Sequence, residues 1–290
     1  MKYNKWKHAC RCMGVTYEEI VDVLNMGVTD YEILRGMLVT GEFCGLCNET
    51  IHRFMREYLG EQGKFLSLPG KVWKGFITEI TDDMLRIEDG SGRCGGYLLL
   101  DRFAVLVGVE DVPLEEPFFT ALTEALEGRT LDSVIFTRVG EASIAIAARL
   151  RQQYPELELV AETTACQILE KALGFGLKLR PVGMGQVMHS GVHTMTFFPD
   201  PETNAMAVYD MVDRAIFSGL AFGASPMADP SPEAAVAYYN DQPALQQAEA
   251  KALLAQLKYR PVRLLCPLCG PAQKQEAANA VLEHLRERVI

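Results

Sequence analysis

The sequence lacks a long apolar run, a surplus of basic residues and an apolar leader. The longest apolar stretch, from Tyr97 to Val109, is interrupted by Asp101 and Arg102, so no membrane-spanning helix is expected. Lysine and arginine number 28 against 38 acidic residues, and the resulting net charge of −10 argues against binding to nucleic acid phosphates. Acidic residues gather at 110–116, which is expected to be a solvated face. The N-terminus has no signal-peptide core, so a cytoplasmic location is expected.

Cysteine, by contrast, is abundant. The chain has 290 residues, 49% of them hydrophobic and 23% charged, which are ordinary values for a globular protein of about two domains. Eight cysteines are unusual in a cytoplasmic protein, where paired cysteines indicate metal or redox chemistry rather than disulfides. Cys94 and Cys166 stand alone and are predicted to pack in the core. The others form close pairs: Cys10 with Cys12, Cys44 with Cys47, and Cys266 with Cys269.

The segment between the first two pairs has the pattern of short capped helices. Thr16 and Glu19 form a capping box before one helix, and Thr29 and Glu32 form a second. After Cys47, apolar residues at i, i+3, i+4 and i+7 spacing predict a third helix. Its apolar face is Ile51, Phe54, Met55, Tyr58 and Leu59. A unit this small usually needs a metal or a crosslink for stability, and four thiolates would hold a metal.

The residues CRCMGVTYEEI, followed by EFCGLC, resemble the 2Fe–2S domain of the bacterioferritin-associated ferredoxin type over about residues 8–60. The resemblance implies a domain at 1–62 in which Cys10, Cys12, Cys44 and Cys47 ligate a 2Fe–2S cluster, and four thiolates suit such a cluster. A structural zinc ion is the alternative, because four thiolates also bind zinc. The ligand types favour the cluster, since C-x-C is less usual in zinc knuckles.

From residue 65 onward, strands and helices alternate. A hairpin is expected at 96–101 and 103–109, and further strands at 134–136, 157–160, 194–198, 206–209, 215–217 and 262–266. Helices are expected at 116–127, 142–153, 164–173, 243–257 and 277–289. Two such blocks predict two sheets between helical layers. The fold class is therefore α+β: a small all-α iron–sulfur domain followed by an αββα sandwich.

Several segments of this second region resemble the metallo-β-lactamase fold, and within it the diiron domain of flavodiiron and related oxygen-binding diiron proteins. GRCGGYLLLDRFAVLVGV resembles the opening hairpin, HSGVHTMTFF and RAIFSGLAFG resemble the segments with a ligand histidine and a bridging aspartate, and RLLCPLCGP resembles the last strand. The resemblance implies such a domain at 65–290. It also implies an ancestral role in oxygen or nitric-oxide chemistry, typical of anaerobes.

Most of the ligands that this family uses are absent. Its H-x-E-x-D-H loop aligns near 137–143, where Glu141 is the only oxygen ligand. The bridging aspartate aligns with Leu220 and the final histidine with Cys269, so only His189 falls on a ligand position of the family. A diiron site needs several carboxylate and imidazole ligands. The domain is therefore expected to be a degenerate member that lacks most metal ligands.

The remaining ligand-type side chains allow two interpretations. His189, His193, Cys266 and Cys269, with Glu141, could form a second metal site for iron or zinc. Alternatively, Cys269 is a buried small residue in place of a histidine, and the two histidines are hydrogen-bonded and partly buried. No catalytic residue is identified.

Three functions are compatible with these patterns. The first is an iron–sulfur electron-transfer protein whose second domain has lost its diiron site and serves as a dimerisation and docking scaffold. The second is an oxidoreductase, rather than a hydrolase, that acts on oxygen or nitric oxide at a non-standard metal site. The third is a redox sensor. A flavoprotein or a ferredoxin-type protein is the expected redox partner, and a homodimer without nucleic acid or membrane is expected.

Overall fold

The N-terminal part of the chain folds as three helices and a short two-stranded sheet. The structure is a computed structural model and describes residues 7–11, 13–40, 47–61, 75–81, 83–89, 93–200, 203–223 and 231–289. Strand β1 (His8–Cys10) pairs with β2 (Val15–Thr16), and the helices are α1 (Tyr17–Asn25), α2 (Tyr31–Leu38) and α3 (Asn48–Glu61). The prediction of an all-α unit was wrong in omitting this sheet, whose strands are too short to leave an alternating pattern.

The helices of this N-terminal unit (described residues 7–61) begin at polar caps. The amide of Glu19 donates to Thr16 Oγ1, and the amide of Thr16 donates to the Glu19 carboxylate at 2.7 Å, so the first predicted capping box is confirmed. At the second helix the prediction was wrong by one residue, because Asp30 and not Thr29 caps α2 and accepts from the amide of Glu32. A carboxylate is as good an N-cap as a hydroxyl, so the helix itself lies where it was predicted.

The predicted apolar face of α3 is buried in a cluster of its own. Ile51, Met55 and Leu59 are fully buried there and pack with Ile20 of α1. The cluster also takes in Val192, which lies in the turn between β10 and β11 of the second domain. The N-terminal unit and the second domain therefore share part of a core, and burying each such aliphatic side chain contributes roughly 1.5–3 kcal/mol.

The second part of the chain, called the sheet domain here (described residues 75–289), begins with a sheet of seven described strands. They lie in sequence order: β3 (Ile77–Thr81), β4 (Met84–Glu88), β5 (Cys94–Leu100), β6 (Ala104–Val109), β7 (Ser133–Phe136), β8 (Glu158–Glu162) and β9 (Lys178–Val182). Strands β3 to β6 are antiparallel, and β6 to β9 are parallel. The parallel strands are joined by α4 (Glu116–Leu126), α5 (Glu141–Gln153) and α6 (Thr163–Leu173). Because β5 and β6 are buried on both faces, they read as continuous apolar runs.

The second sheet has six described strands. They are β10 (Val187–Ser190), β11 (His193–Pro199), β12 (Met206–Asp210), β13 (Ala215–Phe217), β14 (Leu264–Cys266) and β15 (Gln273–Lys274). All neighbours are antiparallel except β13 and β14. Its outer face carries α7 (Pro232–Asp241), α8 (Ala244–Gln256) and α9 (Gln275–Val289). Helix α7 was not predicted, although Ser231 and Pro232 are a good start signal, because it buries little apolar surface.

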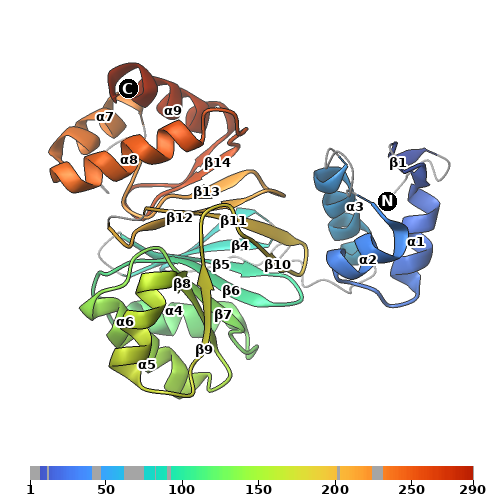
Figure 1. Cartoon of the computed structure of the whole chain (residues 1–290), viewed down its shortest axis with the longest axis horizontal. Helices are drawn as coiled ribbons and strands as arrows, with labels where there is room; N and C mark the ends of the chain where they lie inside the picture. The colour runs from blue at the N-terminus through green and yellow to red at the C-terminus, as the bar shows by residue number, and fades with distance from the viewer. Residues whose placement is uncertain are drawn as a thin grey trace.

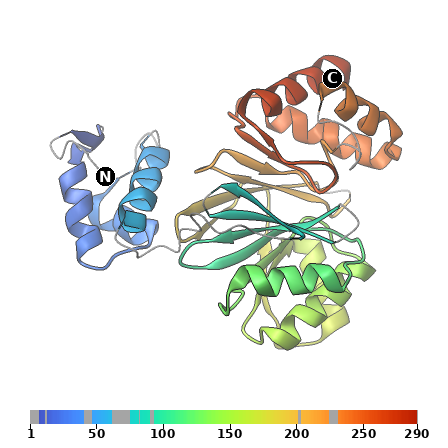
Figure 2. The ribbon, with the colours of Figure 1, turned by 180° about the vertical axis from the view of Figure 1, so that it is seen from behind.

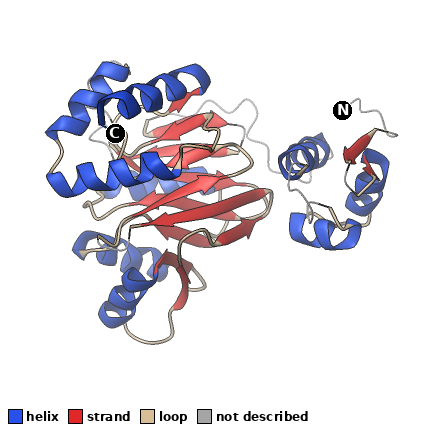
Figure 3. Cartoon of the chain, turned by 45° about the horizontal axis from the view of Figure 1, so that its top comes forward, coloured by secondary structure: helices blue, strands red, loops and turns tan. Residues whose placement is uncertain are grey.

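The two sheets stack face to face between the two helical layers, as Figures 1 and 2 show. One apolar cluster fills the space between the sheets, and two others lie between each sheet and its helices. Tyr97 and Phe217 meet across the sheets with ring centroids 5.4 Å apart. Figure 3 separates the helical and strand layers by colour. The predicted αββα sandwich is confirmed.

The N-terminal unit lies to one side of the sandwich, near β10 (Figure 1). Polar contacts connect the two parts: Arg56 of α3 bonds to Asp213, and Arg102 donates to Thr29 Oγ1 at 3.1 Å. His52 Nε2 and Thr194 Oγ1 are 3.1 Å apart. None of the described helices is long and apolar enough to cross a membrane, as the sequence predicted.

Candidate functional site

Two cysteines of the N-terminal unit lie beside the same tyrosine. Cys10 ends β1 and Cys47 directly precedes α3, and both are buried. Burial raises the pKa of the Tyr31 phenol, and electrostatic interaction with Cys47 and Cys10 adds to this rise. Tyr31 belongs to the same apolar cluster as these two cysteines. Cys12 and Cys44 lie outside the described residues. The two described cysteines belong to separate pairs and share one apolar cluster, and the four-cysteine ligand set stays a prediction.

Two of the loops to which the family resemblance assigned metal ligands, at 137–143 and at Leu220, meet the end of β6 at one edge of the sandwich. Glu110 follows β6, Arg138 follows β7, and Leu220 follows β13. These three residues line one cavity of about 350 Å³. The resemblance assigned ligand positions to the second and third of these loops only, and the alignment stays a prediction.

An arginine occupies the centre of this edge. Arg138 Nε lies 3.2 Å from Glu110 Oε2, and its Nη2 lies 2.5 Å from Glu249 Oε2 on α8. Glu110 was predicted on a solvated face, which was wrong: the residue is 3% exposed. Burial raises the pKa of Glu110 to about 7, although the Arg138 guanidinium opposes this rise.

These residues do not fit a diiron centre. Both carboxylates already pair with a guanidinium, which supplies the positive charge that a metal ion would supply. Thr137 donates its hydroxyl to the carbonyl of Val109 at 3.2 Å, and Leu220 offers no ligand atom. This arrangement agrees with the expectation that the usual diiron ligands are lost.

The proposed second ligand set is spread over several places. His189 lies on β10, where Nε2 is 3.2 Å from Glu32 Oε1 and Nδ1 is 3.2 Å from Thr194 Oγ1. Glu141 begins α5 and lines a different cavity, with Asp111. The structure therefore places His189 against the N-terminal unit and Glu141 on the outer helical layer.

The two cysteines of the C-terminal C-x-x-C also lie apart from those residues. Cys266 ends β14 and is buried in the cluster between the sheets. Cys269 is partly exposed and interacts with Tyr238 of α7. Cys94 and Cys166 are buried in the apolar clusters, as predicted. Of the five residues proposed for the second site, only His193 lies among a compact group of ligand-type side chains.

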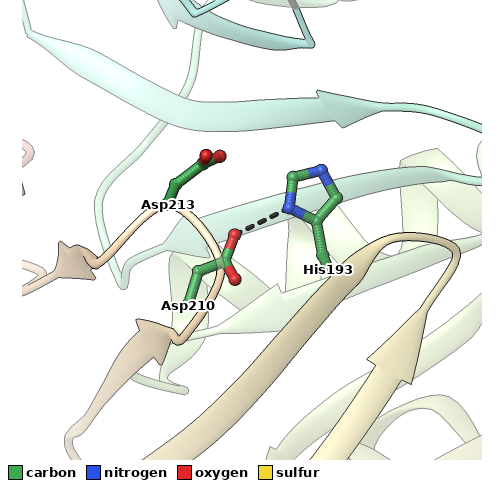
Figure 4. A group of neighbouring side chains, drawn as sticks. All are labelled: His193, Asp210 and Asp213. Carbon is green, nitrogen blue, oxygen red and sulfur yellow. Dashed lines mark hydrogen bonds and ion pairs between the residues drawn. The ribbon is translucent and has the colours of Figure 1, made fainter. Parts of the chain in front are cut away.

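That group is His193, Asp210 and Asp213, shown in Figure 4. Their ligand atoms all lie within 4.8 Å of one another, and no other trio of His, Cys, Asp or Glu in the described ranges was found to converge in this way. Met195 pairs with Asp210 across β11 and β12, so His193, two residues earlier on the same face, lies just beyond Asp210. Asp213 follows in the turn that leads to β13.

A second acidic residue positions the turn that carries His193. The amide of Val192 donates to Asp101 Oδ2 at 2.6 Å, and Asp101 is itself buried. Gly191 in the same turn has φ +56°, and a Cβ there would collide with the Asp101 carboxylate, so the turn requires glycine. Burial raises the pKa of Asp101, although His193 opposes this rise.

Strong electrostatic interactions couple the members of the group. His193 is 1% exposed, and its Nδ1 lies 2.7 Å from Asp210 Oδ2. Burial alone would lower the pKa of His193, but Asp210, Asp83 and Asp101 together raise it to about 10. Burial raises the pKa of Asp213 to about 6, and repulsion from Asp83 adds to this rise. The group therefore contains more acidic side chains than the neighbouring cations fully balance.

An arginine of α3 reaches the same carboxylates. Arg56 Nε lies 3.0 Å from Asp83 Oδ2, and Nη1 lies 3.0 Å from Asp213 Oδ1. Within the described residues, His193 Nε2 and Asp213 Oδ2 are buried and have no hydrogen-bond partner, although Nε2 lies 3.7 Å from Asp83 Oδ2 as an ion pair. One imidazole and two or three carboxylates are ligand types that suit iron, manganese or zinc. Two unsatisfied buried ligand atoms fit a metal ion bound at this point.

Sequence reasoning named His193 but missed its partners. Asp210 and Asp213 follow a strand and have the composition of an exposed turn, and Asp83 has the same pattern before β4. The pairing of β11 with β12 brings His193 and Asp210 together, and this register is set by the apolar residues of both strands. The sequence signal is therefore a histidine at the start of one strand, His193 of β11, followed by aspartates at and just after the end of the next strand, β12.

Comparison with known proteins identifies the fold only. No protein-family model matches the chain, and no curated protein matches its sequence. Among solved structures, the Flv1 flavodiiron core of Synechocystis sp. PCC6803 is similar with a TM-score of 0.60 and 20% identity, over 72% of this chain and 60% of that one. Rubredoxin oxygen:oxidoreductase of the anaerobe Desulfovibrio gigas is similar with a TM-score of 0.62 and 13% identity, over 73% and 61%.

The flavodiiron protein of Giardia intestinalis is similar to the same degree, with a TM-score of 0.60 and 14% identity over 74% of this chain and 60% of that one. This chain thus spans about 60% of the length of these three neighbours. The identities are low, so the likeness is one of fold. The fold of the sheet domain is therefore similar to that of flavodiiron cores, while the bounds 65–290 stay a prediction.

Proposed function

We propose that this chain is an oxidoreductase that acts on oxygen or nitric oxide, with its metal chemistry at His193, Asp210 and Asp213 and with an N-terminal 2Fe–2S cluster as the point of electron entry. The observation that carries the proposal is the buried convergence of these three side chains. The fold shared with flavodiiron cores supports this reaction class over an electron carrier with an inert second domain.

Charge balance supports a cation among these side chains. Four buried or largely buried carboxylates act on one another here: Asp83, Asp101, Asp210 and Asp213. Among the described residues, the cations that interact with these carboxylates are Arg56 and protonated His193. The excess negative charge can be relieved in two ways. One is protonation of a carboxylate, as the raised pKa values of Asp101 and Asp213 indicate, and the other is binding of a divalent metal. A metal bound here also satisfies His193 Nε2 and Asp213 Oδ2.

A bound iron ion would supply a centre that binds and reduces oxygen or nitric oxide. The chain's own residues set its surroundings. Asp210 orients the imidazole of His193 through the bond to Nδ1, and such carboxylate–histidine pairs are usual around metal sites. Nε2, which lies 3.7 Å from Asp83 Oδ2, would bind a metal only after it loses its proton. Arg56 holds Asp83 and Asp213 in place from the other side.

Helix α3 links the proposed cluster to this centre. Cys47 directly precedes α3, and Arg56 of the same helix contacts the carboxylates of the centre. Nine residues of helix correspond to about 14 Å along the axis. Helix α3 thus connects Cys47 to the carboxylates beside His193, which supports one electron path rather than two unrelated sites.

Metal analysis of anaerobically purified protein tests the cluster. We expect two irons, two acid-labile sulfides and visible absorption that dithionite bleaches. Cys47→Ser should remove these signals. Cys166→Ser, which alters a cysteine buried in the sheet domain, should retain them. One zinc per chain with no visible absorption would instead establish a structural zinc site.

A second measurement tests the centre in the sheet domain. Protein with an intact cluster is loaded with Fe(II) without oxygen, desalted and analysed for metal. We expect one further iron in the native chain and in Asp241→Asn, whose aspartate is exposed at the end of α7, and none in Asp213→Asn. Consumption of oxygen or nitric oxide by the reduced protein should be lost in the same variant.

The alternatives give different results in these experiments. A protein that holds two irons, binds no third metal and shows only slow cluster oxidation is an electron carrier with a scaffold domain, and the proposal fails. A redox sensor is expected to bind a protein partner with an affinity that differs between the oxidised and reduced cluster. The electron donor by class is a flavoprotein or a ferredoxin-type protein, and a homodimer belongs to the same proposal.

A further inference from the structure

A cavity lies where the N-terminal unit meets the sheet domain, away from the Glu110–Arg138 edge. Its volume is about 470 Å³, within the range usual for small-molecule sites. Its walls come from α2 and α3 on one side, and from β10, β11, β12 and the segment before β14 on the other. A ligand held here would contact both parts of the chain.

The cavity is basic in an acidic protein. Arg35, Arg214 and Arg260 line it, and none of its described lining residues is aspartate or glutamate, although the chain carries a net charge of −10. Among the described residues, the carboxylate of Glu32 pairs with two of the lining side chains, Arg35 at 3.4 Å and His189 at 3.2 Å. Three guanidiniums at a concave surface suit an anion, because their planar donors match phosphate and carboxylate oxygens.

The same cavity offers aromatic and apolar surface. Tyr259 is 87% exposed at its rim, and Met211 and Val187 are exposed large apolar side chains that also line it. On the inner side lies the buried ring of Tyr31, whose hydroxyl donates to Asn48 Oδ1 at 2.7 Å. An exposed aromatic side chain next to exposed apolar side chains at a pocket is more typical of a binding site than of the rest of a protein surface.

We infer that this cavity binds an aromatic monophosphate of mononucleotide size, with the phosphate held by Arg35, Arg214 and Arg260 and the ring placed against Tyr259. Neither group alone explains the lining, because a simple anion site has no need of exposed Tyr259 and Met211, and an apolar site has no need of three arginines. The inference does not require a metal at His193. It places the ligand beside Tyr31, which belongs to the same apolar cluster as Cys10 and Cys47.

Calorimetric titration of the whole protein tests the inference, with AMP and flavin mononucleotide as probes and with adenosine and inorganic phosphate as the separated halves. We expect one of the two monophosphates to bind once per chain, at least about tenfold more tightly than either half. Its affinity should fall as salt is raised, because the phosphate contacts are ionic. No saturable binding of either monophosphate, or equal binding of phosphate alone, overturns the inference.

Two variants separate the contributions of the ring and the phosphate. Arg214→Gln should weaken binding of both the monophosphate and inorganic phosphate by about tenfold or more, as expected for a lost charged hydrogen bond. Tyr259→Ala should weaken the monophosphate and leave inorganic phosphate unchanged. Arg288→Gln, which removes an exposed arginine at the end of α9, is the charge-matched control and should bind as the native chain does. Equal weakening in Arg288→Gln would show a nonspecific charge effect and contradict the site.

Discussion

Arg56 and Asp83 form an ion pair between the two parts of the chain, with Nε 3.0 Å from Oδ2. The arginine belongs to α3, and the aspartate directly precedes β4. Burial disfavours the charge of Arg56, but Asp83 and Asp213 outweigh it and raise the pKa of the guanidinium. The Arg56 guanidinium therefore stays protonated at every physiological pH. Its pair with Asp83 holds the N-terminal unit against the acidic side chains around His193.

Removal of this arginine should destabilise the protein strongly. Arg56→Gln leaves Asp83 and Asp213 with a buried negative charge and no guanidinium partner. Breaking a buried pair on one side typically costs about 3–5 kcal/mol. We expect urea unfolding to show a loss at the lower end of this range, because the Arg56 side chain keeps 22% of its surface exposed.

A neighbouring arginine provides the control for this measurement. Arg53 lies on the same helix and is exposed, so Arg53→Gln should change the free energy of unfolding by no more than about 0.5 kcal/mol. Equal effects of the two substitutions would mean that the pair with Asp83 contributes nothing specific to the junction.

Glu110 should make stability depend on pH. Its pKa is raised from 4.5 to about 7 in the folded protein. As the pH rises, Glu110 therefore loses its proton in the unfolded chain before it does so in the folded protein, and this favours the unfolded chain. The free energy of unfolding should therefore fall between about pH 4.5 and 7, by roughly 3 kcal/mol at most. In Glu110→Gln this part of the pH dependence should disappear. Glu116→Gln, at an exposed position, should keep it.

Arg138 should contribute to the free energy of unfolding chiefly above about pH 7. Arg138→Met leaves the carboxylates of Glu110 and Glu249 close together without a cation. Near pH 5 Glu110 is protonated and loses no ion pair with Arg138, so the cost is small. At pH 8 the variant must either keep Glu110 charged without a cation or take up a proton, so the loss should approach about 3 kcal/mol. Urea unfolding at the two pH values measures the difference. A loss that is equal at pH 5 and pH 8 would mean that Arg138 contributes by packing rather than by charge.

The layered fold could be predicted because its elements have strong local patterns. Strands β5 and β6 are buried, as their continuous apolar runs indicated. The apolar face of α3 is buried, as its helical spacing indicated. Element ends were harder to place. Helix α2 is capped by Asp30 rather than Thr29, because either residue can cap a helix and only the backbone path distinguishes them.

The functional side chains could be predicted only in part, for a physical reason. Glu110 follows an apolar strand within an acidic run and looks solvated, yet Arg138, 28 residues later, pairs with it in the interior. Likewise, Asp210 is compatible with a turn until the register of β11 and β12 brings it to His193. Buried charges depend on partners distant in sequence, and a local pattern does not contain that pairing.

The two residues that compete for the cap of α2 provide a direct test of the observed boundary. Asp30 accepts from the amides of Glu32 and Ile33, so Asp30→Ala should cost about 1 kcal/mol of stability. Thr29 caps nothing and accepts an exposed hydrogen bond from Arg102, so Thr29→Ala should cost less than about 0.5 kcal/mol. Urea unfolding of both variants measures the order of the two effects. A larger loss in Thr29→Ala would move the start of α2 back to the boundary that the capping-box pattern indicates.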